Sequence, residues 1–309
     1  MFEIGFVMPP EAFFVSISIM DRPVMIRASD PALLAAAAKA CGAWGQADGA
    51  DGPPIVLDLE AVRSPAEGAL EIVVEGPRLW MTGAGVEGFA DARTLAASCT
   101  VPLGLLDQPG RFAGEVIDTL LLFLLARSGR VPLHAAGLAF GQTAVLLAGP
   151  SGAGKSTLSL AAMTRGLQIL SDDTVYIQLQ PRLRIWGFPR PVHVFPADAP
   201  GFIGQTRLRA GKLKAAVPVS PWSGPPVAER AVVVLLERGD EVRLEPIEPS
   251  LAQAALSRLE PGFDLLGQES AAAIAAVTAS GAWRLTLTRD PAAAIAVLAN
   301  HFGAVATPP

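Results

Sequence analysis

The stretch GPSGAGKST, residues 149–157, constrains the fold of this chain more than any other segment. It fits the pattern G-x-x-x-x-G-K-[ST] and stands between the apolar run TAVLLA and the helix-like run LSLAAMTRG. This order predicts a buried strand, a glycine-rich loop and a helix in direct succession. A glycine-rich turn without a ligand is the alternative, but the flanking strand and helix favour a phosphate cradle.

The residue types of the loop suit phosphate binding. Its three glycines are expected to take backbone dihedrals closed to other residues and to let the backbone approach phosphate oxygens. Successive amides would then point inward, and the helix beginning near Lys155 would add the positive end of its dipole. The predicted nucleotide-binding residues are Gly149, Ser151, Gly152, Ala153, Gly154, Lys155, Ser156 and Thr157.

Two side chains of the loop have expected roles of their own. Lys155 would reach the β- and γ-phosphates as a mobile positive charge, and we expect it to face solvent when no ligand is bound. The Ser156 hydroxyl is placed to ligate Mg²⁺. The expected cofactors are therefore ATP and Mg²⁺.

A pair of acids follows the loop closely along the chain. The helix is expected to stop at Arg165 and Gly166, and LQILS is a short apolar strand that ends in Asp172 and Asp173. One right-handed β-α-β crossover would bring both carboxylates beside the loop. One carboxylate could hold Mg²⁺, and the other could take the proton from an attacking hydroxyl. A plain Asp-Asp turn between two strands is the alternative.

His134 precedes the loop in the run VPLHAAGLAF, which with TAVLLAG predicts a hairpin around Gly141 and Gln142. The histidine strand would pair antiparallel with the strand that leads into the loop and bring the imidazole near the γ-phosphate. A core histidine satisfied by a backbone carbonyl is an equally weighted alternative.

Cations gather downstream of the acids. Arg190 lies in the proline-constrained segment GFPRPVHVFP, and QTRLRAGKLKA contributes Arg207, Arg209, Lys212 and Lys214. These groups could neutralise phosphate or hold an acidic substrate, or they could line a solvated helix face. Trp222 lies in the loop-like PVSPWSGPP, as a partner contact or a local plug.

Composition limits the class of protein. Hydrophobic residues make up 51% and mean hydropathy is +0.41, yet the apolar runs fall short of the roughly 20 residues that span a bilayer. A net charge of −5 argues against a generic nucleic-acid binder. The start lacks a basic region ahead of an apolar run, and Cys41 and Cys99 form no C-x-x-C. We expect a soluble cytoplasmic protein without a disulfide framework or zinc site.

Two domains are predicted, covering residues 1–130 and 131–309. In the first, FFVSISIM, RPVMIR, IVLDLEAV, ALEIVVEG and RLWMTG read as strands, and PALLAAAAKACGAW and residues 110–130 as helices. This α+β half either recognises a partner or has only a structural role. In the second, AVVVLLERGDEVRLEPI predicts two strands, GAWRLTLTR an edge-like strand, and PSLAQAALSRL and PAAAIAVLANHF helices.

From His134 to Tyr176, the order of hairpin histidine, phosphate loop, short helix and Asp-Asp resembles the HPr kinase/phosphorylase family. It is more similar to the HPr-kinase-related kinases found with lasso-peptide biosynthesis enzymes. The resemblance extends loosely toward the C-terminus and does not cover residues 1–130. It implies an α/β fold: a P-loop kinase domain of the HPr kinase/PEP carboxykinase type with a mixed sheet, preceded by a smaller α+β domain.

The resemblance also implies roles for individual residues. Lys155 and Ser156 would bind nucleotide and metal, and His134 would lie near the transferred phosphate. Asp172 would serve the metal, and Asp173 would abstract the proton. The glutamate-containing signature of the HPr enzymes is replaced here by residues 187–196, which predicts that HPr is not the substrate and that phosphorolysis is inefficient. The retained PRP sequence gives Arg190 weight as a phosphate or transition-state contact.

The leading hypothesis is an ATP- and Mg²⁺-dependent kinase for a serine of a peptide or small protein, with a lasso-peptide precursor as one candidate. A nucleotide-binding regulatory module with incidental turnover and a kinase for a small hydroxylated metabolite are the alternatives. No nucleic-acid partner is expected, and a homo-oligomer is left open.

Overall fold

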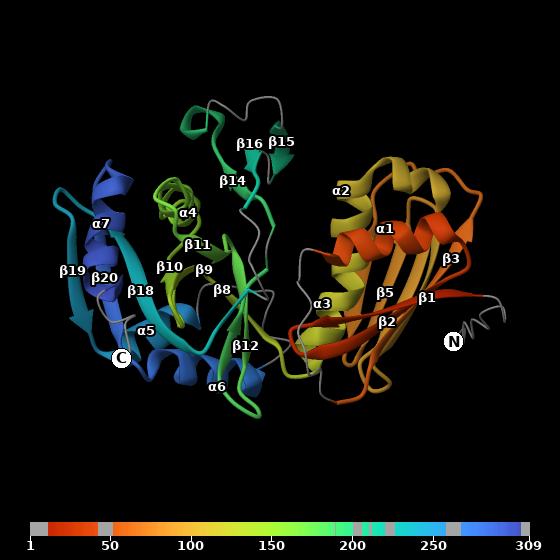
Figure 1. Ribbon diagram of the computed structural model, residues 1–309, viewed down its shortest axis with the longest axis horizontal. Helices are drawn as coiled ribbons and strands as arrows, with labels where there is room; N and C mark the ends of the chain where they lie inside the picture. The colour runs from red at the N-terminus through yellow and green to blue at the C-terminus, as the bar shows by residue number, and fades with distance from the viewer. Residues whose placement is uncertain are drawn as a thin grey trace. The chain divides into compact units, whose positions relative to one another are not determined.

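The computed structural model describes residues 12–42, 52–188, 190–199, 206–209, 212–219, 226–257 and 267–303. The chain divides between Ser128 and Gly129 into two compact units (Figure 1). Gly129 follows the last helix of the first unit with a φ of +86°, a left-handed conformation that glycine adopts without steric cost.

The first unit is built on a seven-stranded sheet in the order β1-β2-β3-β7-β6-β5-β4. β2, β3 and β7 run parallel to one another, and the remaining neighbours are antiparallel. The five predicted strands are confirmed, whereas β6 and β7 were not predicted because glycine, alanine and polar residues interrupt their apolar pattern. The strands are β1 (Phe13–Ile19), β2 (Arg22–Ala28), β3 (Ile55–Val62), β4 (Glu71–Glu75), β5 (Arg78–Gly83), β6 (Val86–Asp91) and β7 (Ala96–Pro102).

Helices cover one face of this sheet (Figure 1). α1 (Pro31–Cys41) begins where the Asp30 carboxylate accepts hydrogen bonds from the amides of Ala32 and Leu33, and Gly42 caps its end. The helix predicted over 110–130 comprises α2 (Pro109–Arg111), the π-helical turn η3 (Phe112–Ile117) and α3 (Asp118–Arg127), after the 3-10 helix η2 (Leu103–Asp107). A π-helical turn widens the backbone locally and is frequent at functional sites.

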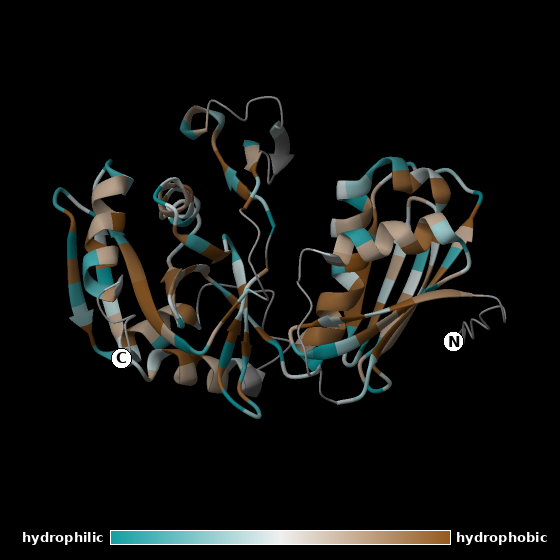
Figure 2. Ribbon diagram, viewed as in Figure 1, coloured by the Kyte–Doolittle hydropathy of each residue, from teal (hydrophilic) through white to brown (hydrophobic). Residues whose placement is uncertain are grey.

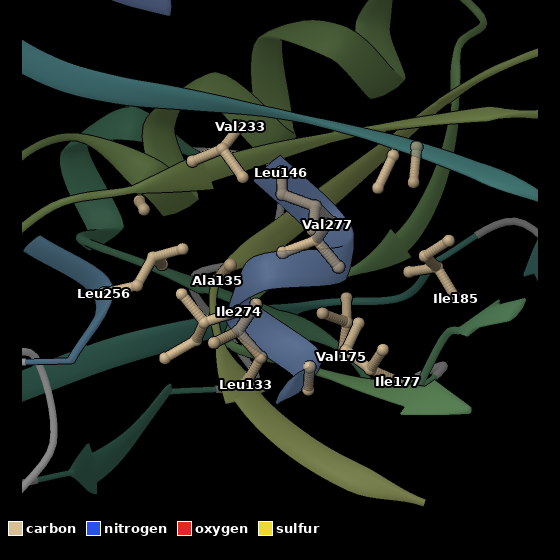
Figure 3. Packing of buried hydrophobic residues seen from close by; sticks show 14 of the residues in the cluster. Leu133, Ala135, Leu146, Val175, Ile177, Ile185, Val233, Leu256, Ile274 and Val277 are labelled. Carbon is tan, nitrogen blue, oxygen red and sulfur yellow. The ribbon is translucent and has the colours of Figure 1, made fainter. Parts of the chain in front are cut away.

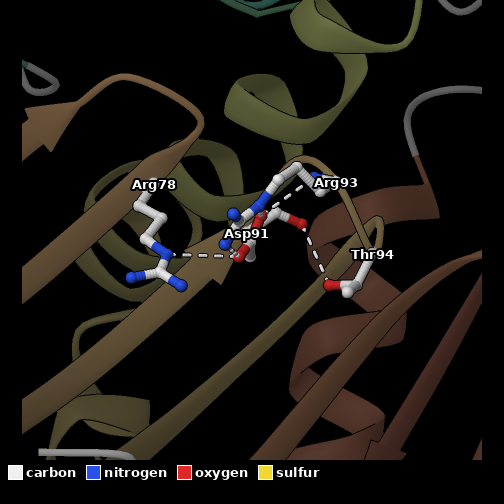
Figure 4. Close-up of polar contacts among 4 residues, drawn as sticks. All are labelled: Arg78, Asp91, Arg93 and Thr94. Carbon is white, nitrogen blue, oxygen red and sulfur yellow. Dashed lines mark hydrogen bonds and ion pairs between the residues drawn. The ribbon is translucent and has the colours of Figure 1, made fainter.

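Asp91 ties the end of β6 to its neighbours through a polar cluster (Figure 4). The carboxylate is 6% exposed and accepts hydrogen bonds from Arg93 at 2.6 Å and Arg78 at 3.2 Å. The Arg93 guanidinium holds the pKa of Asp91 well below its usual range, although burial acts in the opposite direction. This ionised carboxylate stabilises the sheet rather than providing a proton acceptor for chemistry.

The second unit has a six-stranded mixed sheet in the order β11-β9-β10-β18-β20-β19. β10, β18 and β20 run parallel, and β19 pairs antiparallel with β20. β20 was predicted at an edge, which is wrong, because β19 returns along its outer side. The strands are β9 (Ala136–Phe140), β10 (Thr143–Ala148), β11 (Gln168–Ser171), β18 (Arg230–Arg238), β19 (Arg243–Ile247) and β20 (Ala282–Leu287).

The run VPLHAAGLAF is divided between two sheets. β8 (Val131–His134) and β9 are separated at Ala135; β9 pairs with β10, whereas β8 pairs with β12 (Thr174–Gln178). The predicted pairing of the histidine strand with the loop strand is therefore wrong. Leu133 and Leu138 explain the division, because they belong to different hydrophobic clusters on opposite sides of the six-stranded sheet.

Two smaller sheets complete the second unit. The four-stranded sheet has the order β17-β13-β12-β8, and the three-stranded sheet has the order β14-β16-β15. The basic strands 206–209 and 212–217 thus pair antiparallel, and neither forms the helix considered from sequence. The new strands are β13 (Arg184–Trp186), β14 (Val192–Val194), β15 (Thr206–Arg209), β16 (Lys212–Val217) and β17 (Val227–Ala228).

Helices lie on both faces of the six-stranded sheet, and the central parallel strands are strongly hydrophobic (Figure 2). α4 (Lys155–Thr164) and α7 (Pro291–Phe302) cover one face. α5 (Pro249–Leu256), α6 (Gly267–Thr278) and the four-stranded sheet cover the other, where Leu146, Val233 and Val277 meet (Figure 3). Each fully buried aliphatic side chain contributes roughly 1.5–3 kcal/mol, so both cores fix the strand that leads into the loop.

No helix within the described parts of the chain is long and apolar enough to cross a membrane.

Candidate phosphate-binding site

The loop connects the buried strand β10 to α4, and its glycines have two different tasks. Gly152 and Gly154 have φ angles of +86° and +113°, which confirms the expected left-handed conformations. Gly149 lies outside this region, so the prediction for it is wrong. A Cβ atom there would lie 2.9 Å from Ala153 Cβ, and the small size of Gly149 therefore permits close backbone approach.

Lys155 is the first residue of α4 and is not solvent-facing, contrary to the prediction. It is 7% exposed, and its Nζ donates a hydrogen bond to the Gly149 carbonyl at 2.7 Å. The ammonium therefore crosses the mouth of the loop and is held inside the segment that would receive phosphate. A bound anion would compete with one carbonyl for this charge.

The remaining loop residues form a compact turn at the start of the helix. The Ala153 amide donates to the Pro150 carbonyl at 3.0 Å, and the Leu158 amide donates to Gly154 at 2.9 Å. Ser151 and Gly152 are exposed at the tip, whereas Ser156 and Thr157 are half-buried in the first turn of α4. The positive end of the helix dipole thus lies at the loop, as phosphate binding requires.

Asp172 lies directly after β11 and is 8% exposed. One of its carboxylate oxygens, Oδ2, accepts a hydrogen bond from the His193 amide at 3.2 Å. The other, Oδ1, is buried without a hydrogen-bond partner among the described residues. A buried carboxylate oxygen that lacks a partner costs free energy, and a bound cation or hydrogen-bond donor would offset that cost.

The surroundings of Asp172 shift its pKa. Burial raises the pKa, while the His193 amide and the hydroxyls of Ser156 and Ser159 act in the opposite direction. Ser156 and Ser159 are three positions apart on α4 and therefore share the face that Asp172 approaches. Ser159 is fully buried. Its hydroxyl lies close enough to Asp172 to lower that pKa, but it makes no hydrogen bond of normal geometry within the described residues; the spacing alone could have identified it.

Asp173, the second acid of the pair, lies beside His134. His134 lies opposite Thr174 in the β8–β12 pairing, which places its Nδ1 3.5 Å from Asp173 Oδ1. The side chain of Asp173 is 66% exposed, whereas that of His134 is 15% exposed. The Ser171 hydroxyl accepts hydrogen bonds from the amides of Asp173 and Thr174 and fixes the turn between the two acids. The neighbouring carboxylates thus differ sharply in solvent access.

Arg190 lies in the loop between β13 and β14. Its guanidinium stacks over the Phe188 ring at 4.9 Å from the ring centroid, and Phe188 packs edge-on against Tyr176 of β12 at 6.3 Å. The Arg190 amide donates to the Phe188 carbonyl at 2.7 Å. This arginine is therefore anchored through aromatic rings to the strand that follows the acid pair.

One cation of the predicted cluster has a defined contact next to Asp172. Lys214 Nζ donates to the His193 carbonyl at 3.3 Å and lies 4.7 Å from the Phe195 ring centroid. The His193 amide thus donates to Asp172 and its carbonyl accepts from Lys214, on the side of β14 that faces away from β16. The side chains of Arg207, Arg209 and Lys212, and residue Trp222, lie outside the described part of the structure.

Arg238 was not identified from sequence, yet it lies at the start of α4. A Cβ atom on Gly154 would be 3.2 Å from Arg238 Nη2, and Arg238 Nη1 donates to the Thr288 carbonyl at 3.2 Å. Its position at the end of β18, the parallel neighbour of β10, is the signal that could have found it, because parallel strands end at the same sheet edge.

The donor set suits Mg²⁺ bound together with phosphate. Asp172 Oδ1 and the Ser156 hydroxyl are hard oxygen donors, and among the described residues no group of three or more His, Cys, Asp and Glu is arranged to hold a metal ion. Mg²⁺ commonly takes one or two protein ligands and completes its shell with phosphate and water. The residues present fit that arrangement.

A scan against protein-family models found no match, and a search of curated proteins also found none. Among solved structures, the HPr(Ser) kinase/phosphatase from Coxiella burnetii matches with 16% sequence identity and a TM-score of 0.27. The match covers 55% of this chain and 95% of that chain. The functional assignment therefore depends on the chemistry of the site itself.

Proposed function

We propose that the chain is an ATP- and Mg²⁺-dependent kinase that transfers the γ-phosphoryl group to a serine hydroxyl of a peptide or small protein. The observation that carries this proposal is the buried, unpartnered Oδ1 of Asp172 close to the Ser156 hydroxyl at the start of α4. A metal bound by these oxygens with the nucleotide phosphates would balance the buried charge and neutralise charge that develops during transfer.

The residues around this centre would divide the reaction between them. Lys155 would exchange the Gly149 carbonyl for phosphate oxygens, and Arg190 would contact the transferred group. The serine oxygen would form a bond to the γ-phosphorus as the bond to the bridging oxygen of ADP breaks. Asp173 is exposed to an incoming substrate and would take the serine proton, with His134 orienting its carboxylate.

The proposed acceptor is a peptide other than HPr. The likeness of residues 134–176 to the HPr-kinase-related kinases favours a peptide, with a lasso-peptide precursor as a candidate. Residues 187–196 lack the glutamate signature of the HPr enzymes, so we expect neither use of HPr nor efficient phosphorolysis. Residues 131–309 would catalyse transfer in the cytoplasm, and residues 1–130 would recognise the acceptor.

Mass spectrometry of acceptors incubated with the protein, ATP and Mg²⁺ tests this function. A serine-containing precursor peptide encoded nearby should gain one phosphoryl group, and the same reaction with Asp173→Asn should not. ATP binding without transfer would favour a regulatory module. Transfer only to a small hydroxylated metabolite would contradict the peptide acceptor.

A further inference from the structure

The outer strand of the first unit, β4, has a free edge with apolar side chains on both of its faces. Among the described strands, β4 pairs only with β5. Ile72 and Val73 are 47% and 51% exposed at its centre. Edge strands in stable proteins are commonly shielded, because their unpaired backbone groups can accept another strand.

A cavity of about 710 Å³ lies beside this edge, within the size range of ligand pockets. Ile72 of β4 lines this cavity. The remaining lining residues come from the segment that precedes β4 and from the helices that include the π-helical turn η3. In the β4–β5 pairing Ile72 lies opposite Met81, which is fully buried, so Ile72 points to the helix-covered face of the sheet. The lining residues are Gly68, Ala69, Leu70, Ile72, Arg111, Gly114, Glu115 and Thr119.

Arg111 holds the wall of the cavity in place. Its Nε forms an ion pair with Glu115 at 2.8 Å, its Nη1 donates to the Ala66 carbonyl at 3.1 Å, and its Nη2 donates to the Gly68 carbonyl. The segment that leads into β4 is thereby fastened to the helical layer. Gly114 leaves the opposite wall open, because a Cβ atom there would meet no atom within 4 Å.

The charges along the edge indicate what kind of strand it would accept. Residues 64–77 contain Glu67, Glu71 and Glu75 and no lysine or arginine. Glu71 and Glu75 are exposed and share the open face of the sheet with Val73. Arg78 lies opposite Glu75 but is engaged by Asp91, and Arg127 donates to the Gly76 carbonyl. The outward charge of β4 is therefore negative at both ends.

A second copy of this chain fits the edge poorly. Antiparallel pairing of two β4 strands about Val73 would place Glu71 of each copy directly opposite Glu75 of the other. Like charges at opposed positions destabilise a strand pair. A peptide with cations at these positions would instead form two favourable cross-strand pairs.

We propose that β4 and the adjacent cavity bind an extended peptide segment that has basic residues at its first and fifth positions and apolar residues at its second and fourth. The segment would add a strand to the sheet, and its second and fourth side chains would enter the cavity beside Ile72. This inference rests on the proposed kinase function in one respect: the bound segment would be the recognition sequence of the phosphoacceptor, separate from the serine that is modified.

Fluorescence anisotropy with the full chain tests the proposal without ATP. The probe is a labelled peptide with Lys, Val, Thr, Val and Lys between Gly-Ser flanks, and the comparison peptide has Glu at both Lys positions. The wild type should prefer the Lys peptide. The double variant Glu71→Lys, Glu75→Lys should weaken its binding by about tenfold or more, since two favourable pairs become repulsive, and should favour the Glu peptide. Asp240→Lys with Glu241→Lys changes net charge equally in the exposed connection between β18 and β19 of the second unit and should leave the preference unchanged.

A second variant tests the cavity apart from charge. Gly114→Leu should reduce binding of the Lys peptide, because Gly114 lines the cavity and a Cβ atom there has open space, so that the new side chain would occupy the cavity. Gly104→Leu is the matched control, since a Cβ atom there also has open space. Equal binding of both peptides to the wild type, undiminished binding to Gly114→Leu, or a wild-type dimer that the Lys peptide dissociates would each overturn the proposal. Peptide binding without phosphoryl transfer to any acceptor would leave this surface standing and reject the kinase function instead.

Discussion

Asp172 connects the separate parts of the candidate site through its two carboxylate oxygens. Oδ2 accepts the amide of His193 and so ties the three-stranded sheet to the loop, while Oδ1 is buried without a partner near Ser156. Asp173, its neighbour, is largely exposed and pairs with His134. The two adjacent aspartates therefore differ in solvent exposure and in interaction partners, which suits them to different roles.

Substitution should separate these roles. Asp172→Asn should weaken binding of Mg²⁺ and ATP together, because it removes a buried oxyanion beside the loop serine. Asp173→Asn should leave nucleotide affinity near that of the wild type and lower the rate of transfer by about a hundredfold or more, as expected for loss of a general base. Calorimetric titration and single-turnover assays measure the two effects. Loss of ATP–Mg²⁺ binding in Asp173→Asn alone would reverse the assignment.

The raised pKa of Asp172 predicts a pH-dependent stability when no metal is present. A carboxyl whose folded-state pKa exceeds its unfolded value stabilises the fold at low pH, and this contribution is lost as pH rises through the folded pKa. Asp172→Asn, which stays neutral, should therefore gain stability relative to the wild type as pH rises above about 4, the ordinary pKa of an aspartate. Urea unfolding across a pH series measures the difference, with Asp173→Asn as the exposed control. A relative stability that falls with pH would show that burial does not dominate at Asp172.

Lys155 illustrates what a motif predicts and what it leaves out. The pattern around it identified the residue and its helix, but not its hydrogen bond to Gly149, because that contact depends on the folded loop. Lys155→Ala should cost about 3 to 5 kcal/mol of transition-state stabilisation, a loss of at least roughly a hundredfold in rate. Circular dichroism should show a retained fold. Turnover of Lys155→Ala near the wild-type rate would show that the loop lysine does not take part in catalysis.

At the scale of elements, the sequence predicts a strand or helix well where one apolar segment forms one element. It predicts poorly where one apolar segment is divided between two sheets. The strand, loop and helix around residue 149 have continuous apolar patterns, so their order was predicted. The break at Ala135 was not, because Leu133 and Leu138 are both apolar and only the three-dimensional arrangement assigns them to different cores. Arg238 and the His193 amide lie at the site because of the order in which the strands pair. The residue pattern of a single segment does not predict that order.

Gly187 offers a prediction about how two elements fit together. A Cβ atom at this position would lie 2.3 Å from the Leu170 carbonyl oxygen, and Leu170 lies in β11 two residues before Asp172. Gly187→Ala must push this backbone away and should destabilise the protein by about 1–3 kcal/mol, the usual cost of overpacking, while lowering affinity for ATP. Gly104→Ala, which meets open space, should change neither property. Thermal unfolding and ATP titration of both variants make the comparison.

At the scale of the whole molecule, the proposed kinase would be an acidic protein that holds an anionic nucleotide. Its net charge of −5 would repel ATP at a distance, so the proposal needs local cations, with Lys155, Arg190, Lys214 and Arg238 as candidates. Exposed cations such as Arg238 are screened over about 10 Å at 0.1 M salt, whereas Lys155 is buried. Affinity for ATP–Mg²⁺ should therefore fall with added salt, and Arg238→Gln should reduce that dependence. An unchanged salt dependence in this variant would exclude a direct contribution of Arg238.

Phosphoryl transfer from ATP to a serine peptide is the measurement that tests the central claim most directly. The purified full chain is incubated with ATP, Mg²⁺ and a precursor peptide encoded nearby, with HPr as a parallel acceptor, and excess phosphate is then added. The account predicts one phosphoserine on the peptide, none on HPr and no efficient reversal by phosphate, with all transfer lost in Lys155→Ala. Robust phosphorylation of HPr that phosphate reverses would contradict the account, as would transfer that survives without Lys155.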